Sequence, residues 1–358
     1  MSDRGDAVER TIGQPQYEEV GEFPVERGYI WTTCSSVENA NPLFWDDAVA
    51  AEITDGPIAP PTMLSVWFRP HNWSPGRSEP AVPLQVHFDL KAHYGLPEAV
   101  ISDNTIVFHD PVRIGDVITS RQVLRSVSDP KTTKLGTGRF WVIDVEYVNQ
   151  RDDLVGVESY TGFGYRRGEG APGGEGMAQS ASKASSQTLE PGPERPGPQG
   201  RERAAVLDDV QPGDTLPELR HDVSASTIVL GALASRDWRP MHHDHDFAVN
   251  RNGTQDIFMN TPNQAAWFER YVTDWTGPKG RLGRMKFRMK GSVFPGDTML
   301  LTAKVEAVTT DDAGCGWATL LVTLSVDGDA KTDCSVRVAL PTTDDDNPWT
   351  RRGDAWRP

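Results

Sequence analysis

The sequence has few cysteines, no long apolar run and no surplus of positive charge. No signal peptide and no stretch of about 18 apolar residues is present, so a cytoplasmic protein is expected. A formal net charge of -15 argues against a nucleic acid or a membrane surface as partner, because both require a basic face. The cysteines are too few and too scattered for a disulfide framework or a thiolate metal site: Cys34, Cys315 and Cys334.

The length of 358 residues predicts two domains, each long enough to bury its own core. Residues 167–203 are dominated by Gly, Ala, Ser, Pro, Glu and Gln, and such a segment is predicted to be a flexible linker. It separates a first unit, residues 1–166, from a second unit, residues 204–341. Residues 1–22 are expected to be irregular. The acidic, tryptophan-bearing tail, residues 342–358, is expected to pack loosely on the surface.

A carboxylate and an imidazole flank a sharp turn in the segment Ser235-Arg-Asp-Trp-Arg-Pro-Met-His242. A short helix is predicted over residues 223–233 with Ser224 as its N-cap, and Pro240 ends any helical continuation. Asp237 and His242 can then hold one water molecule between them. This pair is the minimum equipment for general acid–base chemistry near neutral pH.

The clearest helical pattern follows within residues 260–277. Thr261 is predicted to be the N-cap, Pro262 the first helical residue, and Gly277 with the next proline the stop. Free N–H groups at the start of this helix can stabilise a developing oxyanion. One face is predicted to be buried, because large apolar residues recur every three or four positions: Trp267, Phe268, Tyr271, Val272 and Trp275.

The two units look like copies of each other. Asn39-Ala-Asn-Pro-Leu-Phe44 aligns on its proline with Asp237-Trp-Arg-Pro-Met-His242, and Ile114-Gly-Asp116 aligns with Pro295-Gly-Asp297 before a predicted strand. The first unit therefore has an amide where the second has the carboxylate and a phenyl ring where it has the imidazole. Neither group moves protons, so the first unit is predicted to be non-catalytic.

The first unit also has a shortened copy of the long helix. The pattern at residues 62–69 is stopped by Pro70 and followed by a segment rich in Pro, Gly and Ser. A short helix leaves space for a bulky ligand, unless Trp67, Phe68 and Trp73 refill it, and both interpretations stay open. Strands are predicted over residues 104–109, 117–127, 139–149 and 154–165 in the first unit, and over 283–291, 298–308, 316–326 and 330–340 in the second.

The strand predicted over residues 283–291 alternates apolar and cationic residues. Lys286 and Arg288 belong to its cationic face, the densest positive patch of an acidic chain. This face can contact phosphate groups of a ligand, although a solvated sheet face has the same pattern.

The sequence disfavours three alternatives to an acid–base site. The segment from His242 to Asp246 contains three histidines and two aspartates, but neighbouring side chains on a short segment cannot all converge on a metal ion, so no metal is predicted. No serine or cysteine stands in a nucleophile elbow. A non-catalytic binding protein is disfavoured because one unit keeps the matched acid–base pair.

The Asp237-x-x-Pro-x-His242 motif resembles the signature of the MaoC-like, R-specific enoyl-CoA hydratases. Two positions depart from that family: Arg239 stands where asparagine is usual, and Asn260 stands where the central helix usually begins with glycine. The longer run from Arg236 to Trp275 resembles most closely the small catalytic subunit of the actinobacterial steroid side-chain enoyl-CoA hydratases.

The resemblance implies an α+β fold with two hot-dog domains in one chain, a pseudo-dimeric double hot-dog. It implies that Asp237 and His242 add water across the trans-2 double bond of an enoyl-CoA, with the backbone of Asn260 holding the thioester oxyanion. Acyl-CoA is then the partner and no further cofactor is required; a homodimer is left open. We expect further substrate contacts from Arg239, Thr261, Lys286 and Arg288.

Two classes of function stay open. The first is a hydratase of a bulky, steroid-type enoyl-CoA that also works in reverse as a dehydratase, with fatty or polyketide acyl groups as alternatives. The second is a hot-dog thioesterase or acyl-CoA-binding protein, because one fold hosts many functions.

Overall fold

The computed structural model describes residues 8, 10–76, 84–167 and 205–358. The predicted linker, apart from Arg167, lies outside the described residues, and the division into two domains with a linker between them stays a prediction. Within the described residues, no helix is both long and apolar enough to cross a membrane.

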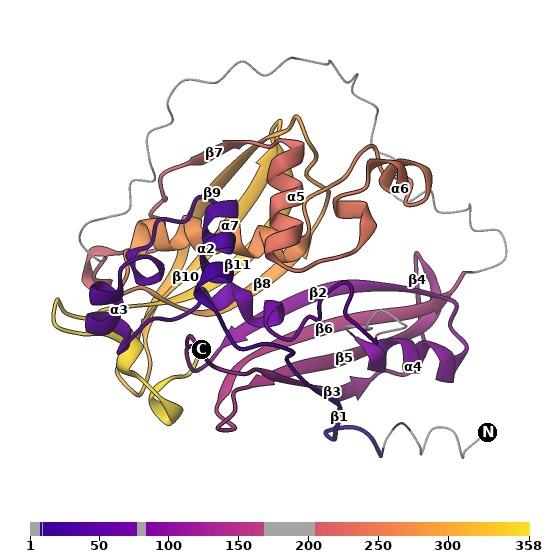
Figure 1. Cartoon of the computed structure of the whole chain (residues 1–358), viewed down its shortest axis with the longest axis horizontal. Helices are drawn as coiled ribbons and strands as arrows, with labels where there is room; N and C mark the ends of the chain where they lie inside the picture. Colours follow the sequence, from indigo (N-terminus) through magenta and orange to yellow (C-terminus); the bar gives the residue numbers. More distant parts are fainter. Residues whose placement is uncertain (1–7, 9, 77–83, 168–204) are drawn as a thin grey trace.

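The described strands form one antiparallel sheet in the order β1-β3-β5-β6-β2-β8-β11-β10-β9-β7, with β4 paired to β5 (Figure 1). Its two halves meet where β2 pairs with β8, and Asn104 lies opposite Phe287 at that seam. The strands of the first half are β1 (Pro15–Val20), β2 (Glu98–Phe108), β3 (Thr119–Val127), β4 (Lys131–Thr133), β5 (Gly136–Val148) and β6 (Leu154–Arg166). Those of the second half are β7 (Leu219–Asp222), β8 (Arg281–Met289), β9 (Thr298–Thr310), β10 (Gly316–Val326) and β11 (Asp329–Leu340).

Helices cover one face of this sheet (Figure 1). The α-helices are α2 (Arg27–Ser36), α3 (Asp47–Thr54), α4 (Gln85–Tyr94), α5 (Ala225–Ala234), α6 (His245–Asn250) and α7 (Thr261–Thr276). The 3₁₀ turns are η1 (Pro42–Phe44), η2 (Pro61–Val66), η3 (Leu207–Asp209), η4 (Pro240–His242), η5 (Pro348–Thr350) and η6 (Gly353–Ala355). The predicted α+β class is confirmed. The short helix predicted after Ser224 is α5, and Ser224 caps it by accepting from the Thr227 N–H.

The internal duplication is visible in the hydrogen bonds. In the first half, Gly115 donates to the Val25 carbonyl at 2.8 Å; in the second half, Gly296 donates to the Val223 carbonyl at 2.8 Å. The aspartate after each glycine folds back in the same way, since Asp116 accepts from the Arg113 N–H and Asp297 from the Phe294 N–H. The strand order is the same in both halves, read outward from the seam.

The central helix α7 is buried on nearly all sides rather than on one face. Trp267, Phe268 and Val272 pack in the core, as predicted. The polar side turned out to be buried as well, because η2 and α2 pack against it: Glu269 accepts hydrogen bonds from Thr62, and Arg270 donates to the Val37 carbonyl at 2.8 Å. The predicted cap is one residue off, because the side chain of Asn260, not Thr261, accepts from a helix N–H.

The first half has only η2, six residues long, where the second has α7. The predicted short helix is therefore a 3₁₀ turn. Trp67 is fully buried beside it and the Phe68 ring lies 5.5 Å from that of Tyr147, so these two side chains refill part of the space. Trp73 does not, since it is 74% exposed. The sequence reading missed α4, whose buried face consists of Val86, His87 and Leu90.

Both ends of the chain are more ordered than expected. Residues 15–20, predicted to be irregular, form β1 and pair with β3, because an open sheet edge offers backbone partners to a polar segment. The tail, predicted to pack loosely, buries Trp349 and Trp356. Its attachment point is Arg281 at the start of β8.

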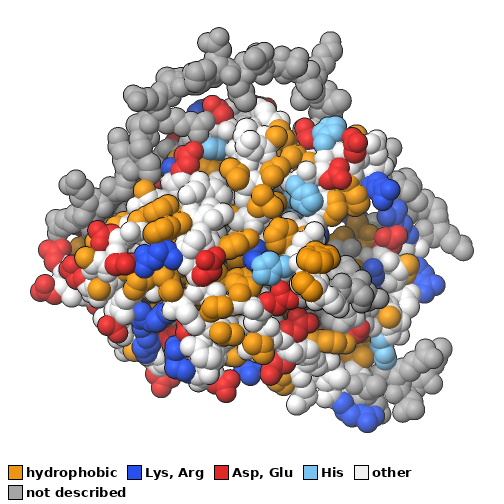
Figure 2. All heavy atoms as spheres, viewed as in Figure 1, with side chains coloured by type: hydrophobic (Ala, Val, Ile, Leu, Met, Phe, Trp, Pro, Cys, Tyr) orange, Lys and Arg blue, Asp and Glu red, His pale blue; other side chains and the backbone are white. Residues whose placement is uncertain are grey.

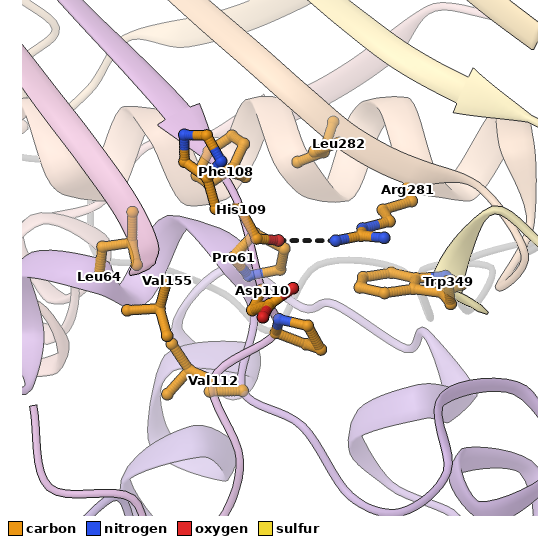
Figure 3. Close-up of a pocket in the computed structure, with 12 residues that line it drawn as sticks. Pro61, Leu64, Phe108, His109, Asp110, Val112, Val155, Arg281, Leu282 and Trp349 are labelled. Atoms are coloured by element: carbon orange, nitrogen blue, oxygen red, sulfur yellow. Dashed lines mark hydrogen bonds between the residues drawn. The ribbon is translucent and has the colours of Figure 1, made fainter. Parts of the chain in front are cut away.

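Arg281 is 1% exposed and binds the tail to both halves of the sheet. Its guanidinium donates to the carbonyls of Pro348 at 3.0 Å and Arg351 at 2.8 Å, and lies 3.6 Å from the centre of the Trp356 ring. It also donates to the His109 carbonyl at 2.7 Å, and both residues line a small cavity (Figure 3). Burial lowers the pKa of Arg281 to about 9, so the side chain is charged at neutral pH.

We expect Arg281→Met to lower the free energy of unfolding by about 2–4 kcal/mol, because three buried or partly buried carbonyls lose a charged donor. Arg284→Met is the matched control: Arg284 lies on the same strand but is exposed, and its loss should cost no more than about 0.5 kcal/mol. Urea unfolding of both variants checks this. Equal stability of the two would mean that Arg281 does not hold the tail.

Candidate active site

The backbone that presents Asp237 is bent sharply after α5. Arg236 adopts a left-handed conformation with φ of 51°, which is unfavourable for a residue with a Cβ. The first half of the chain stabilises it, because the Arg236 guanidinium donates to the Arg69 carbonyl at 2.9 Å and lies 4.2 Å from the centre of the Phe23 ring. The bend reverses the chain, and Pro240 then starts η4.

Asp237 and His242 face each other as predicted. The Asp237 Oδ2 and His242 Nε2 atoms are 3.6 Å apart, and the two residues are 5% and 3% exposed. His242 Nδ1 lies 2.7 Å from the Phe258 carbonyl, which can only accept, so Nδ1 carries the proton. Burial lowers the pKa of His242, against the attraction of Asp237. At neutral pH the imidazole is therefore neutral, with the Nε2 lone pair turned toward Asp237.

The carboxylate of Asp237 is held by charged and neutral donors. Arg239 donates from Nε to Oδ1 at 3.0 Å and from Nη2 to Oδ2 at 3.1 Å. The side-chain amide of Asn260 donates to Oδ2 at 3.0 Å. Burial alone raises the pKa of Asp237, but the hydrogen bonds and charge of Arg239 outweigh it and hold the pKa well below its usual range. Asp237 is therefore ionised throughout the physiological range.

Asn260 has a role that the sequence reading did not include. Its Oδ1 atom caps α7 by accepting from the Asn263 N–H at 3.1 Å, and its Nδ2 atom donates to Asp237 and to the Ser235 hydroxyl. One side chain therefore joins the turn to the start of α7. The available signal was the preference for asparagine at N-caps, which here points one residue earlier than Thr261.

A cavity of about 230 Å³ lies beside His242 and Asn260. Among the described residues, no protein acceptor pairs with the backbone N–H of Asn260, which lies at the positive end of α7. The arrangement therefore offers an oxyanion donor beside two proton acceptors. The cavity is lined by Arg239, Met241, His242, Phe258, Met259, Asn260, Thr261, Met289 and Ser292.

The predicted substrate contacts are only partly brought together. Arg239 and Thr261 line the cavity. Lys286 and Arg288 alternate with the cavity-lining Met289 along β8 and project from the other face of the sheet, where Lys286 pairs with Asp103 at 3.4 Å. Their contact with coenzyme A stays a prediction. On the face shown in Figure 2, Lys and Arg side chains are interspersed with Asp and Glu rather than gathered in one basic patch.

The corresponding turn of the first half holds no titratable pair. Asn39 is buried and accepts from the Asn41 N–H at 2.9 Å, and Phe44 packs into the core. Elsewhere in the described residues, no group of three or more histidine, cysteine, aspartate or glutamate side chains is placed to hold a metal ion. All three cysteines are buried, and burial raises the pKa of Cys315 to about 11, so its thiol is not ionised.

Comparison with known proteins finds a dehydratase domain model and two enoyl-CoA or acyl-CoA hydratase subunits that are similar to this chain. The model of the FAS1-like dehydratase domain region matches residues 10–157. The 3-oxo-4,17-pregnadiene-20-carboxyl-CoA hydratase beta subunit of Mycobacterium tuberculosis is 38% identical over 96 residues, which are 27% of this chain and 74% of that protein. A probable enoyl-CoA hydratase alpha subunit of Thermomonospora curvata is 28% identical over 155 residues, which are 43% of this chain and 48% of that protein.

Solved structures agree on the fold. A MaoC-like dehydratase superposes with a TM-score of 0.62 at 16% identity, covering 93% of this chain and 99% of that one. A Mycobacterium tuberculosis protein described as a double hot-dog superposes with a TM-score of 0.56 at 15% identity, covering 92% and 96%. The predicted double hot-dog is confirmed. The hydratase and dehydratase relatives in turn identify the enzyme as a hydro-lyase. The chain belongs to the MaoC-like family of acyl-CoA hydratases and dehydratases.

We expect Asn260→Ala to lower kcat for hydration about tenfold or more, because Asp237 loses the donor that ties it to α7. Stability should fall by about 1 kcal/mol from the lost cap. Asn347→Ala is the control, since Asn347 caps η5 far from the site and should affect stability alone. Steady-state rates and thermal unfolding of both variants check this. An unchanged kcat in Asn260→Ala would contradict the role assigned to this amide.

Proposed function

We propose that this enzyme adds water across the trans-2 double bond of a bulky, steroid-type enoyl-CoA to give the 3-hydroxyacyl-CoA, and catalyses the reverse dehydration. The observation that carries the proposal is the buried pair of acceptors, Asp237 and His242, beside the N-cap of α7. His242 lines the cavity, and Asp237 is bound by Arg239, which also lines it. The cytoplasmic location and the absence of a further cofactor remain part of the proposal.

The protonation states support a defined path for the water. Both the Asp237 carboxylate and His242 Nε2 are acceptors, so a water that gains access to both can donate to both and turn its lone pair toward the substrate. Asp237 takes one proton as the water oxygen bonds to C3. The electrons move to the thioester oxygen, where the Asn260 N–H and the positive end of α7 stabilise the oxyanion. The oxyanion electrons then return to re-form the thioester carbonyl, C2 takes back the proton that Asp237 accepted, on the same face, and the carboxylate is regenerated.

The size of the acyl group is inferred from two observations. The relative that is 38% identical is named as a hydratase of a pregnadiene carboxyl-CoA, a steroid thioester. The first half has a six-residue 3₁₀ turn where the second has a 16-residue helix, which leaves room beyond the catalytic half. Trp67 and Phe68 occupy part of that room, so the substrate assay decides how much remains.

Asp237→Asn and His242→Ala are each expected to lower kcat by on the order of 10² or more, because each removes one of the acceptors that hold the water. The duplicated turn provides the controls. Asn39→Ser and Phe44→Leu change the corresponding positions of the first half and should leave kcat within about twofold. Circular dichroism confirms that each variant folds. Full activity in Asp237→Asn would remove the acid–base assignment.

The wild-type protein should hydrate a steroid side-chain enoyl-CoA with a kcat/KM at least about tenfold above that for a short fatty trans-2-enoyl-CoA. Following enoyl absorbance and free thiol in the same cuvette separates the functions: hydration removes the absorbance and releases no thiol. Preference for the short ester would mean that side chains such as Trp67 and Phe68 fill the space beside the short turn of the first half. Thiol release would identify a thioesterase instead.

A further inference from the structure

The carboxylate of Asp237 has no position left for a water. Oδ1 accepts from Arg239 Nε at 3.0 Å and from the Arg239 backbone N–H at 3.3 Å. Oδ2 accepts from Arg239 Nη2 at 3.1 Å and from Asn260 Nδ2 at 3.0 Å. An ionised carboxylate offers about four acceptor positions. All of them are filled by the protein, so a water that bridges Asp237 and His242 requires one donor to leave.

The donor that can leave is the guanidinium of Arg239. Asn260 is buried, and its amide is also tied to the Ser235 hydroxyl at 2.8 Å and, through its oxygen, to α7. The Arg239 side chain is 66% exposed, and it lines the cavity. The Asp237 side chain is only 4% exposed, so the departure of Arg239 leaves a buried carboxylate short of a donor, and contacts with the substrate and the incoming water have to offset that cost.

We propose that Arg239 is a substrate-released latch: its guanidinium covers the catalytic carboxylate in the free enzyme and leaves when the acyl thioester enters the cavity. This inference rests on the proposed hydration and names the residue that couples it to binding. Arg239 is a positioning residue here, because it acts through Asp237. The latch keeps the buried carboxylate paired while the site is empty, and it frees Oδ2 for the water when substrate is present.

Release of Arg239 also changes the strength of the base. The charge of Arg239 lowers the pKa of both Asp237 and His242, so both values should rise when the guanidinium leaves. The other charged or titratable groups that act on these residues are Arg69 on Asp237, His243 on His242 and Tyr160 on Arg239. They stay in place in the variants below, so the shift isolates Arg239.

The test compares the pH dependence of kcat/KM, which reports the free enzyme, with that of kcat, which reports the complex. In Arg239→Gln the pH at which kcat/KM falls on the acidic side of its profile (its acidic limb) should rise by about one unit. The corresponding pH for kcat should be the same as in the wild type. Arg239→Lys keeps the charge and should restore most of the wild-type limb. Arg251→Gln, which removes an exposed arginine elsewhere, should move neither limb.

Equal movement of both limbs in Arg239→Gln would overturn the latch, because Arg239 would then stay on Asp237 in the complex. Movement of neither limb would overturn it as well. A second measurement does not depend on turnover: NMR titration of the His242 ring should give a higher pKa in free Arg239→Gln than in free wild type, and the same pKa in both once a saturating, unreactive saturated acyl-CoA is bound. If the NMR titration gives this result but no enoyl-CoA is hydrated, the proposed function fails while the release of Arg239 stands.

Discussion

Burial of an ionised carboxylate is the constraint on which this structure depends. Asp237 is nearly inaccessible to water, and an ion in that position costs several kcal/mol unless donors surround it. The chain supplies them from two places, the turn itself and the N-cap of α7. Because Asn260 serves Asp237 and α7 together, the geometry of the turn and the start of the central helix cannot vary independently. The same contact brings the Asp237 carboxylate next to Asn260, which lines one cavity together with the His242 imidazole.

The first half of the chain contributes structure to the candidate site in the second half. Arg69 accepts from Arg236 through its carbonyl and donates to the Ser235 carbonyl at 3.0 Å, so both residues before Asp237 are held by the first half. Glu269, in the middle of α7, accepts from the N–H of Thr62 at 3.0 Å, and burial raises its pKa to about 7. The first half therefore contacts both the backbone just before Asp237 and the central helix α7.

The pairing of β2 with β8 joins the two halves into one sheet, and the C-terminal tail contacts both halves at this seam. Arg281 starts β8 and binds the tail and the His109 carbonyl just after β2. A buried arginine with carbonyl and aromatic partners fixes three segments that are far apart in the sequence. The candidate site in the second half is therefore supported by residues from both halves and from the C-terminal tail.

Local patterns in the sequence determined much of this protein. The proline-aligned repeat, the three- and four-residue spacing of α7 and the period-two strands predicted the duplicated α+β fold, because these signals depend on neighbours in the chain. The motif of Asp237 and His242 predicted the pair that lies 3.6 Å apart. Segments without a strong local pattern, such as β1, α4 and the tail, were missed or misjudged, since their order comes from partners distant in the sequence.

Only the tertiary structure decided how the pair is set up. Three contacts set the geometry of the pair: Arg239 on Asp237, the Asn260 amide on Asp237, and His242 on the Phe258 carbonyl. They join a turn to a helix end, so the spacing of residues in the sequence does not predict them. The position of Lys286 and Arg288 on the far face of β8 was likewise undetermined, because an alternating strand specifies two faces but not which one meets the cavity. Local periodicity and chemistry are properties of the chain; which donors fill a buried carboxylate depends on packing.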